Sequence, residues 1–385
     1  MTVIKKYSVP GELKKYITAD TIIVRSPGRI NLIGEHTDYN NGFVLPAAID
    51  KAVYVAIEKN AGNKISLHSV DFNESVEVEL ADIKPVPGHW STYILGVVDQ
   101  IIKSGYLLHG FKLSIYGDVP LGAGLSSSAA IECAAAFALN ELFALNIERI
   151  ELVKIAQLAE HEFAGVKCGI MDQFASVFGK KDSVIKLDCR SLEYEYFPVN
   201  MDGYKIVLLD SQVKHSLAST EYNVRRSQCE EGVELIKKKF PEVKSLRDVS
   251  LSMIEDCLGN DEIISKRCRF VVEENIRLQE GCIDLLDGNI KAFGEKMFVT
   301  HKGLSEQYEV SCKELDFLVE AVRDIPEVIG ARMMGGGFGG CTINIVRGEA
   351  IDSVIKRAKD KYKMSVQKDL KAYVVQIEDG TSIIL

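Results

Sequence analysis

The chain has no apolar segment long enough to cross a membrane. Its longest apolar stretch, residues 129–145, is interrupted by Glu132, Asn140 and Glu141, whereas a membrane-spanning helix needs about 20 predominantly apolar residues. The N-terminal segment MTVIKKYSVPGELKKY also lacks the apolar core of a signal peptide. We therefore expect a soluble cytoplasmic protein with no membrane partner.

The cysteines form no C-x-x-C pair, and the chain carries no excess of positive charge. Nine cysteines, an odd number, are scattered along the sequence. This argues against a zinc site or a disulfide framework and favours reduced thiols. The 46 Lys and Arg residues against 55 Asp and Glu residues give a net charge of −9. This balance argues against nucleic acid as the main partner, but a small anionic ligand needs only a few local positive groups.

The length of 385 residues favours two lobes over one small domain. In the first half, the pattern predicts strands at residues 21–26, 51–58, 64–70 and 111–117, helices at 126–143 and 151–163, and paired strands within 183–200. In the second half, it predicts strands at 204–210, 341–346 and 372–377 and helices at 217–239, 263–278 and 350–362. Because strands and helices do not alternate strictly, we expect an α+β fold. A boundary near 190–200 gives lobes of residues 1–195 and 196–385.

A first polar motif occupies residues 27–49, between apolar flanks. It brings together Arg29, Glu35, His36 and Asp38. Carboxylates and an imidazole in close succession suit a polyol, because they can pair with neighbouring hydroxyls, and the arginine can face phosphate oxygens. A solvated surface turn is an alternative, and metal ligation by Glu35, His36 and Asp38 is a lesser one.

A second motif, residues 118–139, combines glycines, serines and an alanine-rich run. Gly122 and Gly124 permit a tight turn, and three serines then open a helix whose free amide groups can cradle a phosphate. The sequence has neither the spacing of a Walker-type loop nor that of a nucleophile elbow. The alternative is a serine helix cap after a glycine turn.

A third motif, residues 330–346, has five glycines in the six positions 335–340 and lies between two strand-like runs. It predicts a hairpin whose tip passes close to another group, with a flexible loop as the alternative. Between the second and third motifs, Glu160 and Asp172 lie at the edge of apolar helical stripes, where a metal or another cation would relieve the cost of a buried charge. Either acid alone is also compatible with a surface position. HEFAG has glycine where a zinc-protease helix needs its second histidine.

Together these stretches resemble the GHMP kinase superfamily, which is named for its galacto-, homoserine, mevalonate and phosphomevalonate kinases. GRINLIGEHTDYNNGFVLP is similar to the galactokinase signature within it, and the likeness continues through PLGAGLSSSAA, AEHEFAGVKCGIMDQF, HSLASTEYNVRR and GARMMGGGFGGCT. It implies an N-terminal α+β lobe, a C-terminal ferredoxin-like α+β lobe and an active site between them. The implied reaction is the Mg²⁺- and ATP-dependent phosphorylation of the C1 hydroxyl of α-D-galactose, the first committed step of galactose catabolism, by a monomer.

The resemblance also implies a role for each matching position. Asp172 matches the catalytic aspartate, and Arg29 matches the arginine that pairs with it and with the transferring phosphate. The implied sugar contacts are Glu35, His36, Asp38, Gly169 and Tyr222. The implied ATP contacts are Trp90 at the adenine, which could equally be a core residue, and the phosphate loop Gly122, Ala123, Gly124, Leu125, Ser126, Ser127 and Ser128. Ser128 and Glu160 match the Mg²⁺ positions.

Two questions stay open in the sequence. An aspartate beside an arginine stays ionised but is a weak proton acceptor, so Asp172 can act as a base or as an orienting group. Met334 departs from the threonine that many members carry before the triple glycine, which leaves the local hydrogen bonding of the hairpin undecided. The alternative functions are an N-acetylgalactosamine kinase and a non-catalytic galactose and ATP sensor. The complete SSSAA run argues against a sensor.

Overall fold

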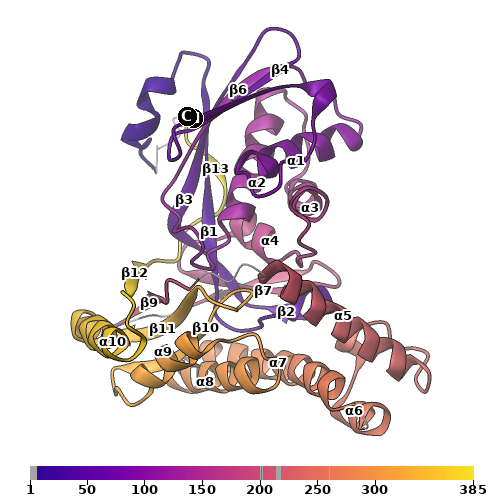
Figure 1. Cartoon of the computed structure of the whole chain (residues 1–385), viewed down its shortest axis with the longest axis vertical. Helices are drawn as coiled ribbons and strands as arrows, with labels where there is room; N and C mark the ends of the chain where they lie inside the picture. The colour runs from indigo at the N-terminus through magenta and orange to yellow at the C-terminus, as the bar shows by residue number, and fades with distance from the viewer. Residues whose placement is uncertain (1–6, 200, 202, 214–217, 260) are drawn as a thin grey trace.

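The computed structural model describes residues 7–199, 201, 203–213, 218–259 and 261–385, and these form two lobes (Figure 1). The first lobe contains a six-stranded sheet of order β13-β1-β3-β6-β4-β5 and a three-stranded sheet of order β2-β7-β8. The six-stranded sheet comprises β1 (Ile22–Asn31), β3 (Pro46–Lys59), β4 (Lys64–Ser69), β5 (Glu74–Glu79), β6 (Phe111–Gly117) and β13 (Ser382–Ile383). The smaller sheet comprises β2 (Phe43–Val44), β7 (Ser183–Asp188) and β8 (Tyr194–Pro198).

Helices cover one face of the large sheet. They are α1 (Ser91–Lys103), α2 (Ser127–Leu142), α3 (Arg149–Ala159) and α4 (Met171–Phe178), and a π-helical turn, η4 (Glu160–Ala164), follows α3. The alanine-rich α2 contacts β1 and β3 directly, because alanine favours helix and its short side chain permits close packing. This packing places the helix start, and the loop before it, beside the end of β1.

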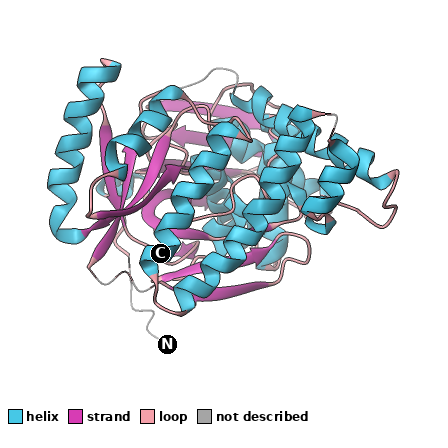
Figure 2. Cartoon of the chain, turned by 90° about the horizontal axis from the view of Figure 1, so that it is seen from below, coloured by secondary structure: helices cyan, strands magenta, loops and turns pink. Residues whose placement is uncertain are grey.

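The second lobe contains a four-stranded antiparallel sheet of order β10-β11-β9-β12. Its strands are β9 (Tyr204–Asp210), β10 (Val328–Met333), β11 (Cys341–Arg347) and β12 (Lys371–Val375), and its helices are α5 (Ala218–Lys237), α6 (Leu251–Leu258), α7 (Glu262–Leu286), α8 (Ile290–Glu306), α9 (Lys313–Arg323) and α10 (Ile351–Val366). Numbered in chain order within the lobe, the strands lie in the order 4-1-3-2, which is the ferredoxin-like arrangement. Helices α8 and α9 contact β10, and α10 contacts β9 and β11; Figure 2 shows these helices from below.

The main strands and helices predicted from sequence are present, with shifted ends. The helix predicted at 151–163 gives way to the π-helical turn after Ala159, and the one predicted at 263–278 runs to Leu286. The helix predicted at 217–239 spans Ala218–Lys237, with Leu217 outside the described residues. Helices α1, α6, α8 and α9 were missed, and α4 was anticipated only as an apolar stripe around Asp172, without bounds. No helix in the described part of the chain has the length and apolarity to span a membrane.

The last strand returns to the first lobe. Strand β13 pairs with β1, with Val24 opposite Ile383 and Arg25 opposite Ser382. The division at residues 195 and 196 stays a prediction, and this pairing shows that residues near the C-terminal end belong to the first sheet.

Candidate active site

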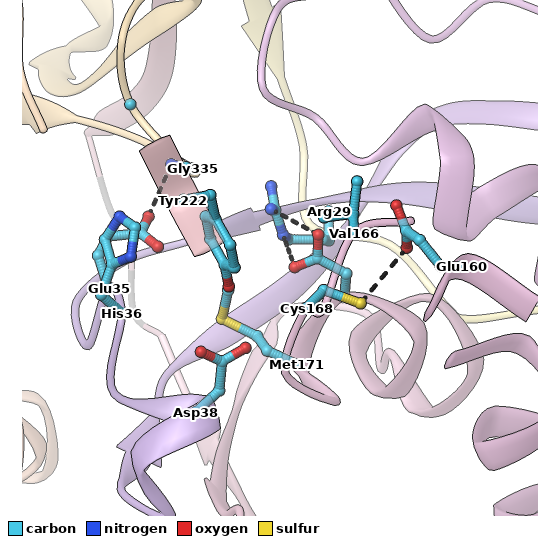
Figure 3. A pocket seen from close by; sticks show the side chains of 13 residues that line it. Arg29, Glu35, His36, Asp38, Glu160, Val166, Cys168, Met171, Tyr222 and Gly335 are labelled. Carbon is cyan, nitrogen blue, oxygen red and sulfur yellow. Dashed lines mark hydrogen bonds and ion pairs between the residues drawn. The ribbon is translucent and has the colours of Figure 1, made fainter. Parts of the chain in front are cut away.

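A cavity of about 260 Å³ lies between the lobes (Figure 3). The first lobe contributes most of the side chains, and the second contributes Tyr222 from α5 and glycines of the β10–β11 hairpin. The lining residues are Arg29, Glu35, His36, Asp38, Glu160, Val166, Cys168, Met171, Asp172, Tyr222, Gly335, Gly336 and Gly337. The structure thus gathers into one place the predicted catalytic pair, most of the predicted sugar contacts and one predicted metal ligand.

The predicted catalytic pair is a bidentate ion pair. Arg29, on β1, donates from Nε to Asp172 Oδ1 at 2.7 Å and from Nη2 to Oδ2 at 2.9 Å, and its Nη1 donates to the Gly124 carbonyl at 2.6 Å. Asp172 lies in the first turn of α4. Burial would lower the pKa of Arg29, but Asp172 and Glu35 more than offset this, so the pKa is raised and the guanidinium stays charged.

The predicted phosphate loop lies next to this pair. Gly122 and Gly124 have φ values of 75° and 76°, and Ser126, the residue before α2, has a φ of 55°. A left-handed conformation is unfavourable for serine, and it lets the Ser126 hydroxyl donate to Asp172 Oδ2. The amide groups at the start of α2 have no partners within the helix and form a natural site for a phosphate.

The two predicted metal ligands contact each other. Ser128 Oγ donates to Glu160 Oε1 at 2.9 Å, and Gln173 donates to Glu160 Oε2 at 2.8 Å and to Glu132 at 3.2 Å. Burial, with the nearby Asp172 charge, raises the pKa of Glu160 to about 7. The described residues contain no cluster of three or more His, Cys, Asp or Glu side chains suited to a metal, so an ion here needs phosphate or water ligands as well.

On the opposite side of the cavity, each predicted acidic sugar contact has a distinct setting. Glu35 Oε1 accepts from Arg332 Nη1 at 3.0 Å and from the Gly335 amide at 2.9 Å, and its Oε2 accepts no hydrogen bond from the residues that the structure describes. Burial and the neighbouring Asp172 charge raise the pKa of Asp38 to about 7. Gly169 packs so closely against Asp38 that any Cβ would overlap its carboxylate.

His36 completes this side of the cavity. Its Nδ1 lies 2.7 Å from the Tyr39 hydroxyl, and its ring lies 5.2 Å from that of Tyr222. Burial lowers the pKa of His36 to about 4, so the ring is neutral at pH 7. Because Glu35 is bound to Arg332 and His36 to Tyr39, metal ligation by Glu35, His36 and Asp38 gains no support.

The predicted adenine contact, Trp90, lies apart from the main cavity. It lines a second, mainly apolar cavity of about 160 Å³ and donates from Nε1 to Glu74 at 2.9 Å. Ser127, the first residue of α2, also lines this cavity, which connects it to the phosphate loop. The shape and lining of this second cavity therefore suit a flat, mainly apolar group bound next to a phosphate site.

Sequence reasoning missed several residues that shape the site. Arg332 is fully buried and also donates to the Asn31 and Leu32 carbonyls. Gln173, Glu132, Tyr39 and Tyr308 were missed as well. For Arg332, Gln173, Glu132 and Tyr39 the only signal was their position inside the motifs, as with Arg332 in GARMMGGG, and Tyr308 lies outside all of them. Met334 in the same hairpin has a buried side chain, and its amide donates to the Cys341 carbonyl at 3.0 Å.

Comparisons with known proteins agree with this geometry. Three family models match: the galactokinase galactose-binding signature over residues 13–59, the GHMP kinase N-terminal domain over 92–180 and the GHMP kinase C-terminal domain over 282–363. The fold and site thus define a GHMP kinase.

Curated relatives narrow the family. The chain is 44% identical over 93% of its length to a galactokinase of Thermotoga petrophila, covering 98% of that protein, and 42% identical to one of Clostridium acetobutylicum, with 92% of each covered. A crystal structure of Lactococcus lactis galactokinase complexed with galactose aligns with a TM-score of 0.92 at 36% identity, over 95% of both chains. The chain belongs to the galactokinase family.

Proposed function

We propose that the protein transfers the γ-phosphate of ATP to the C1 hydroxyl of α-D-galactose, giving galactose 1-phosphate and ADP. The observation that carries this proposal is the bidentate Arg29–Asp172 pair, which lies between the predicted phosphate loop and the acidic cavity. Phosphoryl transfer requires mainly positioning and charge stabilisation. A fixed cation beside a carboxylate, at the junction of two binding sites, supplies both.

The sugar half of the site is assigned to the cavity between the lobes. Its volume of about 260 Å³ is just below the roughly 300–1,000 Å³ of sites for larger ligands, which suits a monosaccharide. Glu35 Oε2 and the Asp38 carboxylate are acceptors for sugar hydroxyls, and Tyr222 packs beside them. Gly169 keeps the space that the Asp38 carboxylate occupies.

The nucleotide half is assigned to the loop Gly122–Ser128 and to the cavity beside Trp90. The phosphates lie against the start of α2, and the adenine enters the apolar cavity that Trp90 and Ser127 line. This places the γ-phosphate near Arg29, whose Nη1 already reaches the loop at Gly124.

The residues present fit a Mg²⁺ ion. Ser128 and Glu160 offer oxygen ligands, which this ion prefers, and no Lys or Arg among the described residues forms an ion pair with the buried Glu160 carboxylate. When bound, Mg²⁺ would neutralise charge on the phosphates. Asp172 orients the sugar hydroxyl and receives its proton late in the transfer, while Arg29 and the phosphate loop stabilise the charge on the transferred group.

The site favours this function over two alternative ones. A regulator without catalysis would not need the phosphate loop, Arg29 and Asp172 together in contact, as they are here. An N-acetylgalactosamine kinase needs room at C2, and the galactose-binding signature favours galactose. ATP as co-substrate, together with nine free cysteines, favours work in the cytoplasm, and we propose that the protein acts there as a monomer.

A coupled assay with MgATP and a panel of hexoses tests the proposal. We expect turnover of galactose and hardly any of glucose, because a buried acceptor built for one hydroxyl is left unpaired when that hydroxyl points elsewhere. Equal turnover of both sugars, or no turnover of galactose, contradicts it.

A further inference from the structure

A continuous chain of hydrogen bonds leads from the sugar cavity into the second lobe. His36 Nδ1 lies 2.7 Å from the Tyr39 hydroxyl, which lies 2.8 Å from the Tyr308 hydroxyl, which in turn lies 3.1 Å from Cys229 Sγ. Neither tyrosine lines the cavity. They can therefore act on a bound sugar only through neighbours that line the cavity. Their hydroxyl groups do so through His36, whereas the Tyr39 ring also contacts that of Tyr222, with centroids 5.3 Å apart, a contact that Tyr39→Phe keeps.

This row of hydrogen bonds connects the two lobes. His36 and Tyr39 belong to the first motif, whereas Tyr308 follows α8 and Cys229 lies within α5. Tyr308 is fully buried and is held in place from the second lobe, because Arg225 donates to its backbone carbonyl at 2.8 Å. The His36 ring also packs against the Tyr308 ring, with centroids 4.9 Å apart. The second lobe thus fixes the histidine of the first.

Each side chain that follows His36 in this row of hydrogen bonds keeps its hydroxyl or thiol proton. Burial raises the pKa of Tyr39 and Tyr308 well above 10 and that of Cys229 to about 11, so the two phenols and the thiol are protonated. A phenol is a strong donor and a neutral imidazole nitrogen a strong acceptor, whereas a phenol oxygen accepts weakly. The favoured direction therefore runs from Cys229 to Tyr308, from Tyr308 to Tyr39, and from Tyr39 to His36 Nδ1.

The other ring nitrogen is then the one that carries hydrogen. Among the described residues, His36 Nε2 is buried and has no well-aligned hydrogen-bond partner. The Gly336 backbone lies close enough to the ring to act as a weak acceptor, and the ring lines the cavity. The hydrogen bond at one nitrogen of a histidine determines the state of the other. We propose that Tyr39 and Tyr308 are positioning residues that fix His36 in its Nε2–H tautomer, so that His36 donates a hydrogen bond to an oxygen of the bound sugar.

This assignment explains how the cavity distinguishes hydroxyl groups. Glu35 and Asp38 offer acceptors, and His36 adds a donor of fixed direction. A sugar hydroxyl that accepts from His36 can donate to a carboxylate, which orders the hydroxyl protons around the ring. The inference rests on the proposed function in one respect, namely that a sugar occupies the cavity.

Two variants each remove one hydroxyl group from the row of hydrogen bonds. Tyr39→Phe removes the donor to His36 Nδ1, and Tyr308→Phe removes the group behind it. Tyr362→Phe is the matched control, because the Tyr362 side chain is as fully buried as that of Tyr308 and its hydroxyl donates to the Ser211 carbonyl at 2.7 Å within the second lobe. Thermal unfolding of all three shows whether the variants are folded.

The first measurement is the ¹⁵N NMR spectrum of the histidine rings in the full chain, with the His36 signals assigned by their loss in His36→Gln. We expect wild-type His36 to show a protonated Nε2 and an unprotonated Nδ1, and Tyr39→Phe to mix the two tautomers. The second is steady-state kinetics. Loss of one buried hydrogen bond predicts a KM for galactose about 3- to 10-fold higher in Tyr39→Phe, with kcat and the KM for ATP within about twofold.

The order of the hydrogen bonds, from Tyr308 to Tyr39 to His36, gives a further expectation. Tyr308→Phe should raise the galactose KM less than Tyr39→Phe, because Tyr39 can still donate to His36, and the double variant should not exceed Tyr39→Phe alone. A protonated Nδ1 in wild type, independent effects of the two variants, or an equal rise in Tyr362→Phe overturns the proposal. If the wild type fails to phosphorylate galactose, the proposed function fails, and the nitrogen signals still decide the tautomer.

Discussion

Replacement of Asp172 by asparagine separates the chemistry of the site from its architecture. The wild-type carboxylate accepts from Arg29 Nε, Arg29 Nη2 and the Ser126 hydroxyl. Asparagine keeps the size but offers one acceptor and one donor. Ser126 can turn and accept from the new amide, but Arg29 Nη2 then meets a donor instead of an acceptor.

The magnitudes follow from these contacts. One lost charge-assisted hydrogen bond lowers the free energy of unfolding by about 1–3 kcal/mol. This is less than the roughly 3–5 kcal/mol for a fully broken buried pair, because Arg29 keeps the Gly124 carbonyl and one side-chain acceptor. The loss of a group that positions the hydroxyl and takes its proton slows phosphoryl transfer by about 10²–10⁴-fold, or about 3–5 kcal/mol in the activation barrier.

Single-turnover rates, with calorimetric binding of galactose and of ATP, distinguish the two effects. We expect Asp172→Asn to bind both ligands and to lose the chemical step, and Arg29→Ala to behave alike. The double variant should lose much less than the product of the single losses, because groups that act as a unit are not additive. Turnover of Asp172→Asn near the wild-type rate would refute the catalytic assignment. If the rate loss of the double variant equals the product of the two single losses, Arg29 serves the phosphate independently of Asp172.

Four other substitutions test the surrounding groups. Gly169→Ala should weaken galactose binding at least about tenfold while ATP binding is kept, because its Cβ displaces the Asp38 carboxylate; equal losses for both ligands would contradict this. Asp38→Asn should weaken galactose binding but raise the free energy of unfolding by about 1–4 kcal/mol at pH 8, because the folded-state pKa of about 7 lies above the usual 3.8 and penalises the ionised form. That gain should shrink as the pH falls from 7 toward 4, and denaturant unfolding at several pH values measures it. Ser128→Ala and Glu160→Ala should raise the Mg²⁺ concentration for half-maximal activity at least about tenfold, and unchanged Mg²⁺ titrations in both would show that neither is a ligand.

The sequence predicted the local elements well because their signals are local. The glycine run between two strand-like segments identified the β10–β11 hairpin, and the apolar stripe around Glu160 predicted a carboxylate at the edge of the core. Both depend on residues within a few turns of each other. The pairing of Arg29 with Asp172, 143 residues apart, came only from the family resemblance.

The contacts that connect the lobes could not be predicted. Arg332 meets Glu35 across 297 residues, and Tyr308 meets Tyr39 across 269. No periodicity marks such pairs, because they exist only once the two lobes have packed. An arginine in a strand next to glycines is typical of a surface position, whereas Arg332 is fully buried among backbone carbonyls.

The pairing of β13 with β1 has a consequence for synthesis of the chain. Strand β1 runs through the centre of the first lobe and carries Arg29, and in the described part of the chain the strand that pairs with its outer edge is β13, at residues 382–383. A ribosome releases that segment after the entire second lobe, so a nascent first lobe exposes the unpaired backbone groups of β1 until then. The enzyme therefore completes its catalytic lobe last, although that lobe is made first, and a chaperone that shields an open sheet edge would act during this interval.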